Sequence, residues 1–375
     1  MVYTPIIVVL AVLITLIPTI LGYNIHEWLY RSLIFIVTSC PCALVISVPL
    51  GYFCGIGRTS KEGVVVKGAK ELENLKEIDY LILDKTGTIT EGVFEVTKID
   101  TKMKKEEFLK LVASAEVHSN HPIAKAIKDK YNDELLDVTN YKEIPGKGIR
   151  CKINNKDILV GNNKLLEENN IIFTPSPDIG TIIYLAEGKN YKGYLVISDK
   201  IKESSKNIKS LNEIINKEII VLSGDNNNIV KDVCNKIGIK KYFGELLPLD
   251  KVAKVEDFKK DGKVLFVGDG INDAPVIKMS DVGVSVGGIG SDVTIEASDV
   301  VLMSEDITKI GQAIKISKLT SRKVTTAIIF ALVIKFSVLL MAILGISTIL
   351  LAVFADVGVT LLAILYVLTI FYTKI

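Results

Sequence analysis

The stretch ILDKTGTIT, residues 82–90, joins the end of an apolar run to a charged, hydroxyl-rich turn. Four apolar residues, 80–83, precede Asp84, and a lysine, two threonines and a glycine follow directly. A short run of this kind is typical of a strand buried on both faces. Because open α/β sheets place reacting groups at the carboxyl ends of their strands, we expect Asp84 to stand at a site of chemistry.

Two further apolar runs end in small and acidic residues. Residues 219–222 lead into Ser223, Gly224 and Asp225, and residues 264–267 lead into GDGIND at 268–273. Amphipathic stretches lie before or between the runs, at residues 202–214, 228–237 and 251–259. Strands that alternate with helices predict a doubly wound parallel sheet, in which the three polar strand ends meet at one edge.

Three carboxylates at such an edge would need a cation. Asp84, Asp269 and Asp273 would otherwise repel one another, and carboxylate oxygens with waters are the ligands that Mg²⁺ prefers. Mg²⁺ in turn points to a phosphate, to which Asp84 could act as nucleophile. The alternative for any one turn is an ordinary solvated loop, but three turns with these sequences favour catalysis. Residues that could neutralise, hydrogen-bond or closely approach the transferring group are Lys85, Lys251, Thr86, Ser223, Gly87 and Gly224.

The motifs DKTGT (84–88), SGD (223–225) and GDGIND (268–273) resemble the phosphorylation-domain motifs of P-type ATPases, which have a haloacid dehalogenase-like fold. The family usually has Thr at the position of Ser223. The resemblance implies that Asp84 accepts the γ-phosphoryl group of ATP and that Lys251 contacts it. The implied catalytic set is Asp84, Lys85, Thr86, Ser223, Gly224, Asp225 and Lys251. The implied Mg²⁺ set is Asp84, Thr86 through its backbone carbonyl, Asp269, Asn272 and Asp273.

Residues 93–202 interrupt the sheet after its first strand. Short strands at 94–99, 149–153, 158–161, 182–186 and 193–197 predict an inserted α/β domain with an antiparallel sheet. His118 and His121 lie near a predicted helix start; a histidine beside a proline is by itself more often a surface cap. In context the segment resembles the nucleotide-binding domain of heavy-metal-transporting P-type ATPases. That resemblance implies adenine and ribose contacts from Glu116, His121, Pro122, Gly146, Gly148, Gly161 and Asn162.

The ends of the chain are strongly apolar. The 375 residues are 49% hydrophobic with a mean hydropathy of +0.38, which is high beside 23% charged residues. Segments near the length of about 20 residues that crosses a bilayer as a helix lie at 5–23, 32–53, 324–346 and 348–372. The first has no basic leader and a second span follows at once, which favours a retained helix over a cleaved signal.

Charge places the middle of the chain on the cytoplasmic side. Basic residues follow the second segment and precede the third, which the positive-inside rule assigns to the cytoplasm. These residues are Arg58, Lys61, Lys67, Lys70, Lys315, Lys318, Arg322 and Lys323. We therefore expect an integral membrane protein, in the plasma membrane, made of two helical hairpins. The net charge of +2 indicates no nucleic-acid partner, and the five cysteines show no disulfide framework.

The span at 32–53 contains SCPCALVIS, with Cys40 and Cys42 on either side of Pro41. Proline removes a backbone donor and opens the helix, so two thiolates could hold a soft or borderline cation such as Zn²⁺, Cd²⁺ or Cu⁺. The alternative is two buried, inert cysteines. Lys335 and Asp356 lie in the middle of the later spans, where ionisable groups are costly and usually functional; a snorkelling lysine is the alternative for Lys335.

An intramembrane lysine together with Asp-Xaa-Gly (Asp356, Gly358) resembles the zinc, cadmium and lead exporters of the P-type family, whereas copper pumps carry Asn, Tyr, Met and Ser in these helices. The implied transported-metal set is Cys40, Cys42, Lys335 and Asp356. A carboxylate that completes a dithiolate site suits Zn²⁺ better than Cu⁺. Lys335 is a candidate built-in counter-ion that helps to expel the metal.

The resemblance divides the chain into a membrane hairpin (1–55), two parts of a phosphorylation domain (56–92 and 203–315), a nucleotide-binding domain (93–202) and a second hairpin (316–375). The Thr-Gly-Glu motif of the family's actuator domain does not occur. We therefore expect the carboxyl-terminal part of a pump. Its expected partners are membrane lipid, ATP, a divalent heavy-metal ion and a separate chain that supplies the actuator.

Two alternatives stay open. A membrane-anchored haloacid dehalogenase-like phosphatase would share Asp84, Lys251 and Asp269. Such phosphatases commonly carry a second Asp two residues after the nucleophile as acid/base, and here Thr86 stands in that place, which favours the ATPase. The second alternative is a truncated chain that binds metal or a full pump without turning over.

Overall fold

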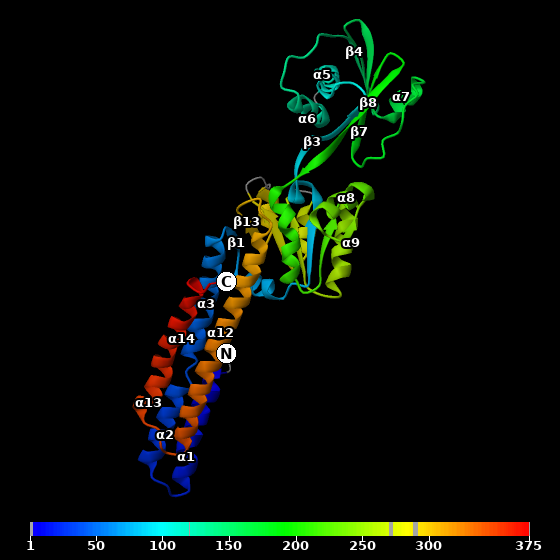
Figure 1. The fold of residues 1–375 in the computed structure, drawn as a ribbon. Helices are drawn as coiled ribbons and strands as arrows, with labels where there is room; N and C mark the ends of the chain where they lie inside the picture. The colour runs from blue at the N-terminus through cyan, green and yellow to red at the C-terminus, as the bar shows by residue number, and fades with distance from the viewer. Residues whose placement is uncertain (1–2, 120, 270–272, 288–291, 375) are drawn as a thin grey trace.

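The computed structural model describes residues 3–119, 121–269, 273–287 and 292–374. The molecule is elongated (Figure 1). A bundle of long helices forms one end, an α/β domain follows it, and a smaller sheet-and-helix domain lies at the far end. This order along the molecule sets the membrane part and the inserted domain on opposite sides of the α/β domain.

The α/β domain contains a seven-stranded sheet in the order β1-β13-β12-β11-β2-β9-β10, parallel except for β1. The three strands predicted from their polar ends are neighbours, because Leu83 of β2 pairs with Val267 of β11 and Val221 of β9. The strands are β1 (Val64–Val66), β2 (Tyr80–Asp84), β9 (Glu218–Leu222), β10 (Lys241–Phe243), β11 (Val264–Gly268), β12 (Val282–Val286) and β13 (Val300–Leu302).

Helices cover both faces of this sheet, which confirms the doubly wound fold. One face packs against α4 (Ala69–Asn74), a 3₁₀ segment at Glu203–Glu213, α8 (Asn227–Ile237) and the first turns of α12 (Lys309–Ile343). The other face packs against α9 (Pro248–Lys259) and α10 (Ala274–Met279), with α11 (Asp292–Ala297) beside them. The stretch predicted as a helix at 202–214 is therefore a tighter 3₁₀ turn.

Two long strands, β3 (Thr90–Thr101) and β8 (Asn190–Ile201), lead into and out of the inserted domain. They belong to a six-stranded antiparallel sheet in the order β3-β8-β7-β6-β5-β4. Helices α5 and α6 cover one face, and α7 covers the other. Elements not yet bounded are β4 (Val138–Ile144), β5 (Gly148–Ile153), β6 (Lys156–Gly161), β7 (Thr181–Glu187), α5 (Lys105–Ala115), α6 (Pro122–Lys130) and α7 (Asn163–Glu168).

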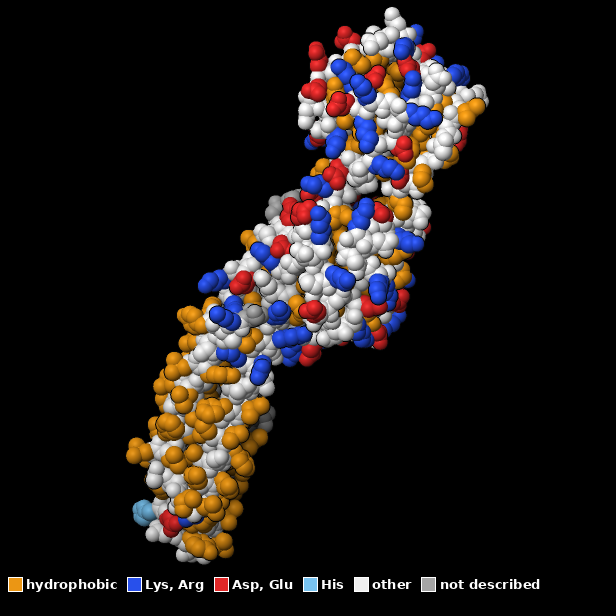
Figure 2. All heavy atoms as spheres, in the orientation of Figure 1, with side chains coloured by type: hydrophobic (Ala, Val, Ile, Leu, Met, Phe, Trp, Pro, Cys, Tyr) orange, Lys and Arg blue, Asp and Glu red, His pale blue; other side chains and the backbone are white. Residues whose placement is uncertain are grey.

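Four spans of the described chain are long and apolar enough to cross a membrane: Tyr3–Ile20, Ile25–Lys61, Lys309–Ile343 and Ile349–Phe371. Their outer surface is almost wholly apolar (Figure 2). The second span is broken, because α2 (Ile25–Thr38) ends before Pro41 and α3 (Cys42–Lys61) begins after it. The first span is α1 (Tyr3–Ile20). In the fourth span a π-helical turn at Phe354–Gly358 joins α13 (Ile349–Val353) to α14 (Val359–Leu368).

Candidate active site and membrane metal site

Three carboxylates meet at the carboxyl edge of the central sheet. Asp84 ends β2, Asp269 directly follows β11, and Asp273 precedes the first residue of α10. Their carboxylate oxygens lie within 4.8 Å of one another. The structure thus brings together the three acids that the strand ends predicted, whereas Asn272 lies outside the described residues.

One ammonium group holds two of these acids. Lys251 of α9 places its Nζ 2.5 Å from Asp84 Oδ1 and 2.9 Å from Asp273 Oδ1. Burial and the charge of Asp273 raise the pKa of Asp84 to about 7, against the opposing charge of Lys251. Burial opposes the ammonium charge, but the two carboxylates outweigh it and raise the pKa of Lys251. The three carboxylates meet the charge of Lys251 and, at Asp269, that of Lys202, and their oxygens form a donor set that fits Mg²⁺.

The turn after β2 passes very close to the carboxylate of Asp269. Gly87 has a φ of +74°, and a Cβ atom built on it would lie 1.7 Å from Asp269 Oδ2. Lys202, which is 5% exposed, donates a hydrogen bond to the carbonyl of Gly87. Burial and the charge of Asp273 raise the pKa of Asp269, and Lys202 opposes that shift. A side chain at position 87 would therefore displace a carboxylate of the cluster.

The SGD turn after β9 closes the same edge. Ser223 is buried, and its Oγ accepts a hydrogen bond of 3.1 Å from the backbone N–H of Asp225. A Cβ atom on Gly224 would lie 3.3 Å from the carbonyl oxygen of Leu246. The serine therefore shapes this turn, as an N-cap-like hydroxyl does in many loops.

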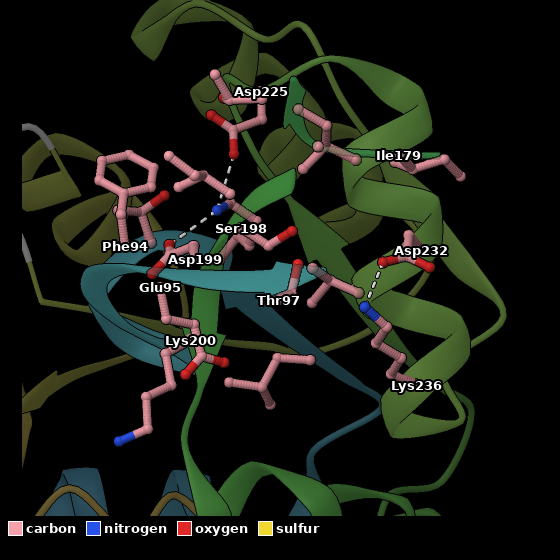
Figure 3. A pocket seen from close by; sticks show the side chains of 18 of the residues that line it. Phe94, Glu95, Thr97, Ile179, Ser198, Asp199, Lys200, Asp225, Asp232 and Lys236 are labelled. Carbon is pink, nitrogen blue, oxygen red and sulfur yellow. Dashed lines mark hydrogen bonds and ion pairs between the residues drawn. The ribbon is translucent and has the colours of Figure 1, made fainter. Parts of the chain in front are cut away.

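Lys85 was predicted to neutralise the transferring group, but its ammonium is held in ion pairs with two other carboxylates. Its buried ammonium pairs with Asp225 at 2.8 Å and with Asp199 at 3.1 Å, two carboxylates that converge on one nitrogen in Figure 3. Asp199 also accepts a hydrogen bond of 2.5 Å from the hydroxyl of Thr90. Lys85 therefore links the SGD turn to the strands of the inserted domain, and Lys251 is the ammonium that faces Asp84.

Sequence reasoning missed Asp199 and Lys202. Both follow the apolar part of β8, at the point where the chain returns from the inserted domain to the 3₁₀ segment. Their side chains are about nine-tenths buried or more, which is unusual for charged residues without a partner. The only signal in the sequence is this pair of charges directly after an apolar strand, a pattern that is also common at exposed strand ends.

A cavity of about 640 Å³ opens beside Lys85, between β3, β8 and α8. Asp225 and Asp199 line it, and the Asp232–Lys236 ion pair of α8 forms its far wall (Figure 3). Among the described residues, none of those expected to contact adenine or ribose lines this cavity. They lie in the inserted domain, some at the start of α6 and the others in the turns around β5 and β6.

Part of this set forms a pair of interlocked turns. Gly148 of β5 pairs with Gly161 of β6, and a Cβ atom on Gly148 would lie 2.2 Å from the carbonyl oxygen of Val160. Asn162 donates a hydrogen bond of 2.9 Å to the carbonyl of Gly146. The four predicted residues of these turns are therefore neighbours, with Gly146 exposed and Gly161 buried.

Glu116 and His121 flank the start of α6. His121 caps this helix, since its Nδ1 accepts a hydrogen bond of 3.2 Å from the N–H of Ile123, and Pro122 is the first helical residue. Glu116 is 7% exposed, and burial raises its pKa to about 7 against a hydrogen bond from Ser119. His118 packs against the ring of Tyr141 with centroids 5.2 Å apart.

The membrane site lies at the break in the second span and at the π-helical turn of the fourth span. Cys40 and Cys42 flank the break between α2 and α3, and Asp356 lies in the π-helical turn before α14. The sulfur atoms and a carboxylate oxygen lie within 4.8 Å of one another. Lys335 of α12 reaches the same point, with Nζ 2.7 Å from Asp356 Oδ1 and a hydrogen bond to the carbonyl of Cys40.

The two cysteines depart from the expectation of free thiols. The structure joins Cys40 to Cys42 by a disulfide. Pro41 turns the chain so that the two Cα atoms are 5.5 Å apart, a separation at which cysteines can be bridged. Because thiolates rather than disulfide sulfurs are metal ligands, only the reduced pair can complete a site with Asp356.

A family model of haloacid dehalogenase-like hydrolases matches residues 78–281. The chain belongs to this family, whose fold is the doubly wound sheet with Asp84 at its edge. Within it, the chain is 45% identical to the cadmium, zinc and cobalt-transporting ATPase of Bacillus subtilis (strain 168), over 96% of its own length and 53% of that protein. It is 42% identical to the zinc-transporting ATPase of Synechocystis sp. (strain PCC 6803), over 97% of its length and 52% of that protein.

The solved structures agree. A crystal structure of a zinc-transporting PIB-type ATPase in the E2.Pi state superposes with a TM-score of 0.88 at 29% identity, covering 98% of this chain and 62% of the other. Together with the four spans, these similarities define an integral membrane protein. The chain spans about half the length of the curated relatives it matches.

We expect Gly87→Ala to weaken the divalent-cation site by at least about tenfold, because the new methyl group must displace Asp269, a carboxylate of the cluster. Binding of Mn²⁺, a hard cation with the same preference for oxygen ligands, can be measured by electron paramagnetic resonance. Gly92→Ala is the matched control, since Gly92 has a φ of +68° but nothing within 4 Å of its Cβ position. Equal losses in both variants would assign the effect to backbone strain alone.

Glu116→Gln should stabilise the inserted domain increasingly as pH rises. In the folded domain Glu116 keeps its proton up to about pH 7, whereas the unfolded chain releases it near the ordinary pKa of 4.5. The free energy of unfolding of the native domain therefore falls as the pH rises from about 4.5 to 7. Relative to the native chain, the variant should gain about 3 kcal/mol between pH 4 and pH 8. Chemical unfolding at the two pH values measures this, with the exposed Glu134→Gln as control; a pH-independent difference would contradict it.

Proposed function

We propose that this chain carries the catalytic and metal-binding parts of an ATP-driven exporter of a divalent heavy metal, Zn²⁺ or Cd²⁺, with Pb²⁺ as a further candidate. The observation that carries the proposal is the presence of two sites on one chain. One is the Asp84–Lys251–Asp273 cluster, and the other is the intramembrane set of two cysteines and Asp356. The similarity to zinc- and cadmium-transporting ATPases supports the same conclusion.

In the proposed reaction, ATP binds with its base and ribose at the patch of Glu116, His121 and the two glycine turns. A carboxylate oxygen of Asp84 attacks the γ-phosphorus, the bond to the bridging oxygen of ADP breaks, and an aspartyl phosphate remains. Lys251 is placed to neutralise charge on the transferring group, because its ammonium already contacts the attacking carboxylate. The attacking form is the ionised carboxylate, so with a pKa of about 7 Asp84 must first have lost its proton; the transfer itself then moves no proton.

The carboxylates of Asp84, Asp269 and Asp273 are the residues that would hold Mg²⁺. When bound, the ion would neutralise phosphate oxygens and the excess negative charge of the cluster. Thr86, at the second position after the nucleophile, has no carboxyl group with which to activate water. This favours a long-lived phosphoenzyme over the rapid hydrolysis of a simple phosphatase.

At the membrane site the cargo metal would compete with Lys335 for Asp356. In the reduced state, two thiolates and a carboxylate offer Zn²⁺ three of the four ligands that it usually takes. Metal binding would displace the Lys335 ammonium from Asp356, and the return of the ammonium would favour release. The proposed direction is export from the cytoplasm across the plasma membrane. A water-directing group for dephosphorylation would come from outside the stretch described here, in the remaining half of a protein as long as the relatives or in a separate chain.

The first test is acid-stable labelling of the lipid-reconstituted chain from γ-labelled ATP, Mg²⁺ and a reductant. We expect label that requires Zn²⁺ or Cd²⁺, is weaker with Cu⁺ and disappears in Asp84→Asn. Label that is independent of any metal would break the proposed link between the two sites. Absence of label while ATP still binds would point to the alternative of a chain that does not turn over alone.

Lys335→Ala should tighten Zn²⁺ binding by about tenfold or more, because it removes the cation that occupies Asp356. Equilibrium dialysis of the reduced protein measures the affinity. Asp356→Asn should weaken binding, and in that background Lys335→Ala should change it little. A weaker affinity in Lys335→Ala alone would contradict the counter-ion role.

A further inference from the structure

A groove between α12 and α14 lies just inside the cytoplasmic end of the bundle. It has a volume of about 270 Å³ and is lined by Thr326, Ala327, Phe330, Leu362, Ala363 and Tyr366. The floor consists of two buried alanines, and the walls are apolar side chains that are about four-tenths exposed or more. The hydroxyl of Thr326 donates to the carbonyl of Arg322, so this lining hydroxyl already has an acceptor within its own helix.

Cations stand at the cytoplasmic end of this groove. The ammonium of Lys323 lies 5.2 Å from the ring centroid of Tyr366 and donates hydrogen bonds to the hydroxyls of Thr369 and Thr373. Arg322, one turn above Thr326, is exposed. Among the described residues neither cation has a carboxylate partner. Basic side chains gather above the apolar bundle on the face shown in Figure 2.

The neighbouring helices add positive charge and no compensating acid. Arg58 of α3 is buried and donates a hydrogen bond to the carbonyl of Ile370. Its positive charge repels that of Lys323. Glu73, a carboxylate that also contacts Ser321 of α12, is already paired with Lys76 and bonded to the hydroxyl of Tyr52. Within the part of the chain that the structure describes, Arg322 and Lys323 therefore have no carboxylate partner beside the apolar groove.

We propose that the groove binds one anionic phospholipid, with an acyl chain against Phe330 and Leu362 and the phosphate at Arg322 and Lys323. Only an amphipathic anion satisfies both halves of the site, since a free phosphate would leave the groove unfilled and a neutral lipid would leave the cations unpaired. Basic residues at a membrane surface attract anionic lipid by about 1 kcal/mol each, which corresponds to about a fivefold preference per cation.

Fluorescence quenching by brominated lipid tests the site in the full chain. The only tryptophan, Trp28, lies in α2 near the opposite end of the bundle, so Leu362→Trp in a Trp28→Phe background reports on the groove. Leu365→Trp, which is exposed on the same helix outside the groove, is the matched control. The reconstituted protein is compared in vesicles that contain phosphatidylglycerol or phosphatidylcholine with bromine on the acyl chain.

We expect phosphatidylglycerol to be preferred at position 362 by at least about fivefold, and not at position 365. Arg322→Gln with Lys323→Gln should abolish the preference, whereas Lys315→Gln, an exposed change farther up α12, should leave it intact. Equal quenching by both lipids, or a preference that survives the double substitution, would overturn the proposal. Loss of all quenching at position 362 alone would also overturn it, because it would mean that protein covers the groove. Displacement of the lipid by glycerol phosphate would overturn it as well, because it would assign the site to a free anion.

Discussion

The contact between Lys251 and the two aspartates on either side of it allows an acidic edge to exist inside a folded domain. An isolated buried carboxylate costs several kcal/mol, and two of the three carboxylates here are nearly inaccessible. α9 delivers the ammonium from a fixed position, because its first turn begins at Pro248 and Asp250 accepts a hydrogen bond of 2.9 Å from the N–H of Leu247. The geometry of β2, α9 and α10 is therefore set by one charge.

The membrane site uses the same physical solution. Asp356, like Asp84, faces a lysine that belongs to a separate helix. Each of these carboxylates also belongs to a set of groups that could hold a metal ion. The difference lies in the surplus of negative charge. At the catalytic edge two negative charges remain after Lys251 is counted, so a divalent cation can bind beside the lysine. At the membrane site Asp356 is the one carboxylate of the set, so the proposed cargo must replace the lysine.

Residues whose role depends on local pattern could be predicted from the sequence. The strand ends at Asp84 and Asp269, the break at Pro41 and the intramembrane Asp356 each combine a regular apolar run with a residue that the run cannot accommodate. Groups whose role depends on a distant partner could not. Lys85 was predicted as one of the groups that could neutralise the transferring phosphoryl group, and its buried ammonium bonds to Asp199, a residue 114 positions later in the chain.

Other elements escaped prediction for similar reasons. β4, VTNYKEI, lies at the edge of the inserted sheet and has too few apolar residues to stand out as a strand. The pairing of Cys40 with Cys42 depends on the turn at Pro41 rather than on spacing along a cysteine framework. Gly148 and Gly161 were singled out only by the family resemblance, since a glycine alone does not reveal which backbone it approaches.

Helix α12 is one continuous helix of 35 residues without a proline, from the core of the α/β domain to the far side of the bundle. Ile310, packed under the sheet, and Lys335, at the membrane site, are about 37 Å apart along it at the rise of an α-helix. Since an unbroken helix without proline has no built-in kink, it acts as a lever arm. A tilt of about 5° at the sheet would swing Lys335 by about 3 Å, more than the distance that now joins it to Asp356.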